Sequence, residues 1–179
     1  MKTKYMLLGV ILIIASFSTL ALAAKSTEDI APVSPFDVNR YLGKWYEVAR
    51  LPNNFEYGLD YVTATYSLRP DGKVAVLNQG IKQNGRPKKI TGTATIIDAA
   101  VPARLSVSFF LWFGADYLIF DLDQTNYDYA MITSGNRGYL WILSRTPQMN
   151  DTLYSSLVAK AAALGFETTQ LIKVKQPAN

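Results

Sequence analysis

The stretch "LGKWYEVARLP", Leu42 to Pro52, decides the fold, because Gly43 and Trp45 stand where a strand begins. A second stretch, "YLWILSRTP" from Tyr139 to Pro147, carries another Trp and ends in an Arg. Both are runs of aromatic and branched side chains closed by turn residues, which is typical of strands. We interpret them as the first and last strands of one sheet.

Six further runs between these two stretches also indicate strands. "VTATYSL" places Val62, Ala64 and Tyr66 on one face and Thr63 and Thr65 on the other, which is the period of a half-buried strand. The other runs cover residues 73–80, 89–98, 104–110, 116–123 and 127–133, and turn-forming sequences such as "RPDG" and "SGNRG" separate them. Eight short strands joined mostly by tight turns predict an all-β, eight-stranded antiparallel up-and-down β-barrel, because closure removes exposed sheet edges. A two-sheet sandwich is the alternative, although it usually needs longer connections.

The period changes from two to that of a helix after Pro147. An apolar stripe at helical spacing has a capping residue before it and a glycine after it. The residues of this pattern are Asn150 or Asp151 as N-cap, Leu153, Leu157, Ala161 and Leu164 in the stripe, and Gly165 as the stop. One C-terminal α-helix is therefore expected to pack outside the barrel, followed by a short strand at 172–174.

The N-terminal residues read as an export signal. Lys2 and Lys4 precede an apolar run, and Ala21 to Ala23 form an A-x-A cleavage site, so residues 1–23 are predicted to be a signal peptide. An uncleaved membrane anchor is the alternative. Residues 24–35 are polar and contain proline, which predicts a flexible leader before a single domain at 36–179.

The composition excludes several classes of function. There are 18 Lys and Arg against 14 Asp and Glu, and loss of Lys2 and Lys4 would lower the net charge from +4 to +2, so no nucleic-acid partner is expected. The sequence contains no Cys, hence no disulfide and no site for the lipid of a lipoprotein, and no His. Ser-His-Asp, Cys-His and H-E-x-x-H sites and an axial His for haem are therefore excluded. We expect neither an enzyme nor a cofactor or metal site; a lipid-modifying enzyme that uses carboxylates, Lys or Tyr is the remaining catalytic alternative.

Three motifs together resemble the lipocalin family, in particular the branch of bacterial lipocalin Blc and apolipoprotein D. They are "LGKWYEVARLP", "NYDYAMI" and "YLWILSRTP", and the resemblance runs from Phe36 to Pro177. It implies that Gly43, Trp45 and Arg145 are a structural signature. Arg145 would stack on Trp45 at the closed end of the barrel, and Gly43 would allow the tight entry into the first strand.

The alternation of the runs also predicts which side chains face the interior of the barrel. The inward set is Val62, Ala64, Tyr66, Val76, Asn78, Ala94, Leu105, Val107, Phe109, Tyr117, Ile119, Tyr129, Met131, Tyr139 and Trp141. From it, the predicted ligand-binding residues are Tyr66, Val76, Asn78, Phe109, Tyr117, Tyr129, Tyr139 and Trp141. By resemblance, Tyr66, Asn78 and Trp141 match positions that line the apolipoprotein D pocket. Each aromatic could equally be ordinary core, and a register slip of one residue would reverse every assignment.

The resemblance further implies binding, storage or transport of a long-chain lipid, such as a fatty acid or lysophospholipid, for envelope maintenance under stress. A flat hydrophobic ligand of retinoid or tetrapyrrole type, or a filled barrel that serves only as an interaction module, are the alternatives. The implied location is the periplasm or the outer membrane, without a lipid anchor, or outside the cell. Pairing with a second copy and contact with a membrane surface stay open. Lys82, Arg86, Lys88 and Lys89 gather near one loop, where they could meet an anionic head group or form a solvated cluster.

Overall fold

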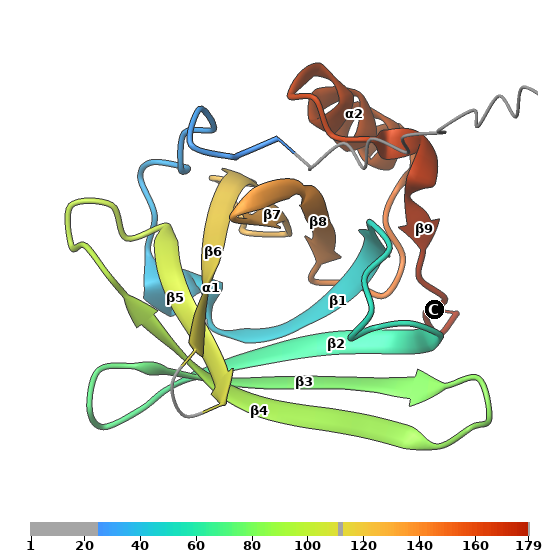
Figure 1. The fold of residues 1–179 in the computed structure, drawn as a ribbon, viewed down its shortest axis with the longest axis horizontal. Coiled ribbons are helices and arrows are strands. Elements are labelled where there is room, and N and C mark those ends of the chain that lie inside the picture. Colours follow the sequence, from blue (N-terminus) through green and yellow to red (C-terminus); the bar gives the residue numbers. More distant parts are fainter. Residues whose placement is uncertain (1–24, 111–112, 179) are drawn as a thin grey trace, which may run out of the picture.

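The computed structural model describes residues 25–110 and 113–178, and these form a β-barrel with a helix on its outside (Figure 1). Eight long strands follow one another in the chain, as the alternating runs predict. Their bounds are β1 Gly43–Arg50, β2 Leu59–Leu68, β3 Val74–Lys82, β4 Pro87–Ile96, β5 Arg104–Phe110, β6 Phe113–Leu122, β7 Tyr129–Ser134 and β8 Asn136–Ser144. The remaining elements are α1 Val38–Tyr41, α2 Asp151–Ala163, the 3-10 turn η1 Thr168–Gln170 and β9 Ile172–Lys173.

The strands pair as an antiparallel meander that closes on itself. Each strand from β2 to β8 pairs with the next, and β1 pairs with both β8 and β2. Strand β1 thus has a hydrogen-bonded neighbour on each side. The two-residue β9 pairs with the end of β1, at Ala49 and Arg50. This confirms the eight-stranded barrel, because a sandwich would leave two open sheets.

Helix α2 covers the outside of the barrel over β6, β7, β8 and β1. Asn150 is the N-cap, its side chain accepting from the backbone N–H groups of Thr152 and Leu153. Leu157 and Ala161 are buried on the barrel side, and Gly165 follows the helix with φ +83°. A second hydrophobic core thus lies between helix and barrel, outside the sheet. It consists of Ile30, Ala49, Leu51, Leu118, Phe120, Met131, Leu140, Ile142, Leu157, Ala161 and Phe166.

The segment before α1 is packed against the barrel, in contrast with the flexible leader expected for 24–35. Ile30 and Thr27 are buried, and Ile30 belongs to the outer core. Arg137 of β8 donates from Nη2 to both carboxylate oxygens of Asp29 at 2.8 Å and also bonds the carbonyl oxygen of Ser26. This segment is held by few apolar residues and by several specific polar contacts. Its polar composition therefore predicted a flexible segment, although the segment is packed. The predicted signal peptide, 1–23, lies outside the described residues.

A β-bulge at Val48 changes which side of β1 faces inward. Glu47 pairs with Leu143 and Ala49 with Ile142, so Val48 is an extra residue between two paired positions. Residues three apart on a regular strand point to opposite faces. The bulge shifts that phase, so that Glu47 and Arg50 both point into the barrel.

Candidate functional site

An apolar cavity of about 270 Å³ lies inside the barrel. Side chains from seven of the eight long strands and from the β1–β2 loop line it. They are Glu47, Phe55, Glu56, Val62, Thr63, Ala64, Tyr66, Val76, Asn78, Val107, Phe109, Ala115, Asp116, Tyr117, Ile132, Ser134, Tyr139, Trp141 and Leu143. Most of this surface is aliphatic or aromatic, so the interior suits a hydrophobic guest.

Seven of the eight residues predicted to bind ligand lie on the wall of this cavity. They are Tyr66, Val76, Asn78, Phe109, Tyr117, Tyr139 and Trp141. The structure therefore brings together residues from β2, β3, β5, β6 and β8. Their placement agrees with the alternation of the runs; their role in binding remains a prediction.

Tyr129, the eighth predicted ligand-binding residue, does not lie on the cavity wall. Met131, which was also predicted to face the interior, does not lie there either. Both pack with the outer core beneath α2, while Ile132 and Ala130 take the inward positions of β7. The pairing of Ile132 with Trp141 puts these two side chains on the inner face. The inward assignment of Tyr129 and Met131 was wrong because both faces of β7 are buried. One face lines the interior of the barrel and the other packs beneath α2, so both sets of alternate residues are apolar. Alternation cannot then tell inside from outside.

Three aromatic rings form one end of the cavity. Tyr139 and Trp141 stack with ring centroids 5.9 Å apart, and Phe55 from the β1–β2 loop lies 6.2 Å from each. Phe55 is 53% exposed although it lines the cavity, so this loop lies where the cavity meets solvent. We call this end the mouth.

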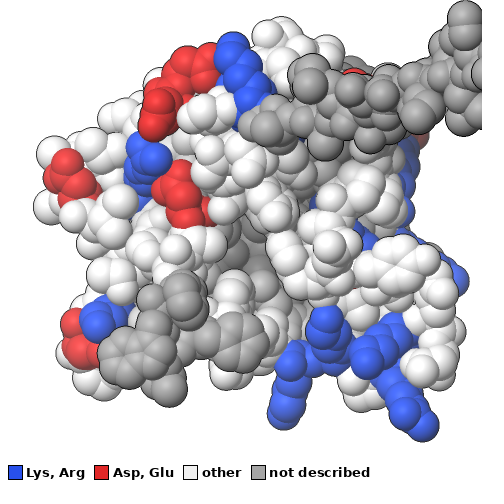
Figure 2. Space-filling view, in the orientation of Figure 1, with Lys and Arg blue, Asp and Glu red and all other residues white. Residues whose placement is uncertain are grey.

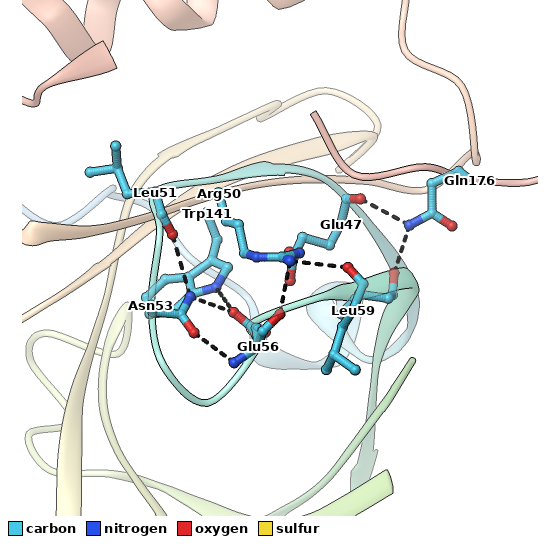
Figure 3. Close-up of polar contacts among 9 residues, drawn as sticks. Glu47, Arg50, Leu51, Asn53, Glu56, Leu59, Trp141 and Gln176 are labelled. Carbon is cyan, nitrogen blue, oxygen red and sulfur yellow. Dashed lines mark hydrogen bonds and ion pairs between the residues drawn. The ribbon is translucent and has the colours of Figure 1, made fainter. Parts of the chain in front are cut away.

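A buried network of charged groups lies beside the mouth (Figure 3). Arg50 donates to Glu47 Oε1 at 2.7 Å and to the carbonyl oxygens of Glu56 and Leu59 at 2.9 and 3.0 Å. Glu56 Oε2 accepts from Trp141 Nε1 at 3.0 Å and from Asn53 Nδ2 at 2.7 Å. The network thus fixes the β1–β2 loop and orients the indole of Trp141 in the wall.

Burial governs the protonation of this network. It raises the pKa of Glu47 well above its usual range; the nearby carboxylate of Glu56 adds to the effect, and Arg50 opposes it. Among the described residues, the cavity wall contains Glu47, Glu56 and Asp116 but no Lys or Arg. A ligand carboxylate is therefore disfavoured deep in the cavity.

Sequence reasoning missed Glu47, Arg50 and Glu56 as cavity-side residues. Glu47 could have been found, since it lies two residues after the inward Trp45 in the same strand. Arg50 could not, because only the bulge at Val48 turns it inward. Glu56 lies in a loop, where no periodicity applies.

The floor of the cavity carries a chain of three tyrosine hydroxyls. The hydroxyl of Tyr117 lies 2.8 Å from those of Tyr41 and Tyr66. Burial is the main cause that raises the pKa of Tyr66 to about 12 and that of Tyr117 well above its usual value, so these groups stay neutral. Asn78 adds one more polar atom, since its Oδ1 is buried and has no hydrogen-bond partner among the described residues. The wall therefore offers a ligand a few uncharged hydrogen-bonding groups.

The opposite end of the barrel is closed by the signature residues. The guanidinium carbon of Arg145 lies 3.8 Å from the ring centroid of Trp45, which is fully buried. Arg145 also donates to the carbonyl oxygens of Arg40, Lys44 and Tyr127 at 2.7, 3.1 and 3.2 Å. Gly43 has φ +92°, and a Cβ there would lie 3.4 Å from Arg145 Nη1. This is the arrangement that the motif resemblance implies.

The family follows from a comparison with known domains. A lipocalin-like domain model matches residues 36–176. The chain belongs to the lipocalin family. Lipocalins bind small hydrophobic ligands, and a barrel with a closed end and an apolar interior is consistent with that.

The relatives confirm the resemblance to the Blc and apolipoprotein D branch of the lipocalins. The chain is 44% identical over 150 residues to outer membrane lipoprotein Blc of Vibrio cholerae, covering 83% of this chain and 88% of the relative. It is 39% identical over 121 residues to apolipoprotein D of Bos taurus, covering 64% and 63%. The solved structure of insecticyanin from the tobacco hornworm Manduca sexta superposes with a TM-score of 0.69 at 21% identity, covering 87% and 88%, and shows the shared lipocalin fold.

The described residues contain neither a membrane-spanning helix nor a cluster of metal-binding side chains. No helix within residues 25–110 and 113–178 has the length and apolar character needed to cross a bilayer. The same residues contain no group of three or more acidic side chains placed to hold a metal ion.

Proposed function

We propose that this lipocalin binds one long-chain lipid, of the fatty acid or lysophospholipid class, with its acyl chain in the barrel cavity. The observation that carries the proposal is the apolar cavity of about 270 Å³. It lies near the lower end of ligand pockets, which span roughly 300–1,000 Å³. That size favours a single acyl chain over a lipid with two.

The charges of the wall support one orientation of such a lipid. Glu47 and Glu56 lie beside the mouth, and the described residues of the lining include no cation that could neutralise an anionic head group. The acyl chain would therefore lie inward, toward Tyr117, and the head group would stay at the mouth. With few polar groups to recognise a head group, selectivity among single-chain lipids is expected to be broad.

A chain-length series tests the proposal. Fatty acids and lysophospholipids of increasing length are added to the purified protein while tryptophan emission is followed, with Trp141→Phe as the control that removes the reporter in the cavity. Each methylene that enters an apolar site contributes about 0.8 kcal/mol, so Kd should fall by up to about fourfold per methylene until the cavity is full. Affinity independent of chain length, or an emission change that persists in Trp141→Phe, would count against it.

Native mass spectrometry of protein purified from its source, followed by lipid extraction, identifies the natural ligand. A single-chain lipid supports the proposal. A visible absorption band would instead indicate a flat pigment-like ligand. Lipocalins are generally binding and transport proteins, so we propose carriage of the lipid rather than its chemical conversion.

We also propose that the protein acts in the cell envelope. The relatives named Blc are described as outer membrane lipoproteins. This sequence has no Cys to carry a thioether-linked lipid, so we propose that the protein is not held at the membrane by such a lipid. Cell fractionation tests this: protein that stays with membranes through a high-salt wash would show that it is anchored by other means.

A further inference from the structure

The hairpin that joins β3 to β4 carries four cations. Lys82, Arg86, Lys88 and Lys89 are exposed, and in the part of the chain that the structure describes none of them takes part in a salt bridge. Residues 80–96 contain no Asp or Glu. Figure 2 shows a group of blue side chains at the lower right, where Figure 1 draws the β3–β4 hairpin, with no red side chain beside them in this view.

This basic hairpin lies against the loop that forms the mouth. Lys88 Nζ donates to the carbonyl oxygen of Phe55 at 2.6 Å, and Leu59, just after the loop, pairs with Lys82. Of the acidic residues nearby, Glu56 is buried and hydrogen-bonded to Trp141, and Asp60 is half-buried on β2. The local surface is thus strongly positive.

The same loop also exposes two aromatic rings. Phe55 is 53% exposed and Tyr57 is 85% exposed, and nothing in the described chain covers Tyr57. Exposed aromatic side chains beside a cluster of cations match the chemistry of a bilayer interface, where rings enter the head-group layer and cations meet anionic lipids. A nucleic acid would be met by a broader basic surface, and a protein partner would not explain why the patch lies beside the entrance of a lipid-sized cavity.

We propose that the β1–β2 loop and the β3–β4 hairpin form a docking surface for an anionic lipid bilayer, which holds the cavity mouth at the membrane. A lipid could then pass between bilayer and barrel with little exposure to water. Phe55 and Glu56 of the β1–β2 loop belong to both this surface and the cavity wall, whereas Tyr57 and the four hairpin cations do not line the cavity.

Sedimentation with vesicles tests the proposal. The full chain is mixed with vesicles of phosphatidylcholine alone or with added phosphatidylglycerol, at low and high salt. Binding should require phosphatidylglycerol and weaken as salt screens the charges. The variant Lys82→Gln, Arg86→Gln, Lys89→Gln should lose roughly fivefold in partitioning per cation, on the order of 100-fold in all.

The matched control removes the same number and kind of charges from other parts of the surface. Arg69→Gln, Lys73→Gln, Lys160→Gln takes away two Lys and one Arg that are exposed; Arg69 and Lys73 flank the β2–β3 turn, at the opposite ends of these strands from the β1–β2 loop, and Lys160 lies on α2 outside the barrel. This variant should bind the vesicles within a few fold of the unaltered protein. Equal losses in both variants would show an effect of net charge alone and would overturn the proposal, as would failure of the unaltered protein to bind anionic vesicles.

The aromatic contribution and the ligand site are separated by two further measurements. Tyr57→Ser, which leaves the cavity wall intact, should weaken vesicle binding several-fold; no change would overturn the role of the ring. The hairpin variant should still bind a single-chain lipid in detergent-free solution with unaltered chain-length dependence. A hairpin variant that no longer binds vesicles but still binds the single-chain lipid supports docking. If the unaltered protein bound no single-chain lipid, the proposed function would be refuted, whatever the result for docking.

Discussion

Replacing Arg145 with alanine should loosen the closed end of the barrel without altering the cavity. The side chain covers the buried indole of Trp45 and bonds three backbone carbonyl oxygens from segments far apart in sequence. None of these atoms belongs to the cavity wall. Stability and ligand binding should therefore respond differently to the change.

The expected loss of stability follows from these contacts. The cation–ring contact is worth about 1 kcal/mol at a partly exposed site. The hydrogen bond to Tyr127 is half-buried and adds about 1 kcal/mol, while the bonds to Arg40 and Lys44 are exposed and are partly replaced by water. We expect Arg145→Ala to lower the free energy of unfolding by about 2–3 kcal/mol, or the Tm by roughly 5–10 °C.

Urea and thermal unfolding measure this loss, with lipid affinity measured on the same variant. Arg145→Lys keeps the charge but not the planar fork that reaches three carbonyls, so it should retain about half of the stability difference. Arg69→Ala is the control, because Arg69 forms an exposed pair with Asp71 that contributes about 0–1 kcal/mol. If Arg145→Ala unfolded like Arg69→Ala, the interpretation of Arg145 as the closure of the barrel would be refuted.

Three other changes address the buried network, the floor and the outer core. The folded protein holds the Glu47 proton more tightly than the unfolded chain does, because the pKa of Glu47 is raised in the fold. The free energy of unfolding should therefore fall as pH rises from the usual Glu pKa of about 4.5 toward the raised pKa. Urea unfolding at several pH values measures this dependence, and Glu47→Gln should flatten it. Tyr117→Phe removes the centre of the hydroxyl chain and should cost about 1–3 kcal/mol, because the hydroxyls of Tyr41 and Tyr66 lose their shared partner; an unchanged unfolding midpoint would show that they find others. Leu157→Ala opens the outer core and should cost about 2–4 kcal/mol with lipid affinity unchanged, whereas a matching loss of affinity would show that the helix shapes the cavity.

The strands and the closed end could be predicted from the sequence because each has a local signal. Strands covered on one face only, such as β2, show regular alternation of apolar and polar side chains. The pairing of Trp45 with Arg145 spans 100 residues, yet both lie in motifs that the family resemblance connects. Most of the cavity wall followed from the phase of these strands.

The features that could not be predicted depend on three-dimensional context. The sequence does not indicate which residues of β7 face the interior, because α2 packs over the outer face of the strand. Tyr129 and Met131 are therefore hydrophobic like Ile132, although they face outward. The pairing of Glu47 with Arg50 depends on a bulge that no residue type marks. The packing of residues 25–35 depends on Arg137, which lies more than 100 residues away and bonds Asp29.

The cavity links the fold to the proposed function, because only the folded barrel forms it. A lipid whose acyl chain lies in this apolar cavity of about 270 Å³ binds the folded protein and not the unfolded chain, so it should stabilise the protein. At a free ligand concentration of 100 times Kd the gain is about 2.7 kcal/mol, or roughly 5–10 °C in Tm. An interior that admitted no lipid would give no such shift, and the carrier interpretation would then fail while the fold remained intact.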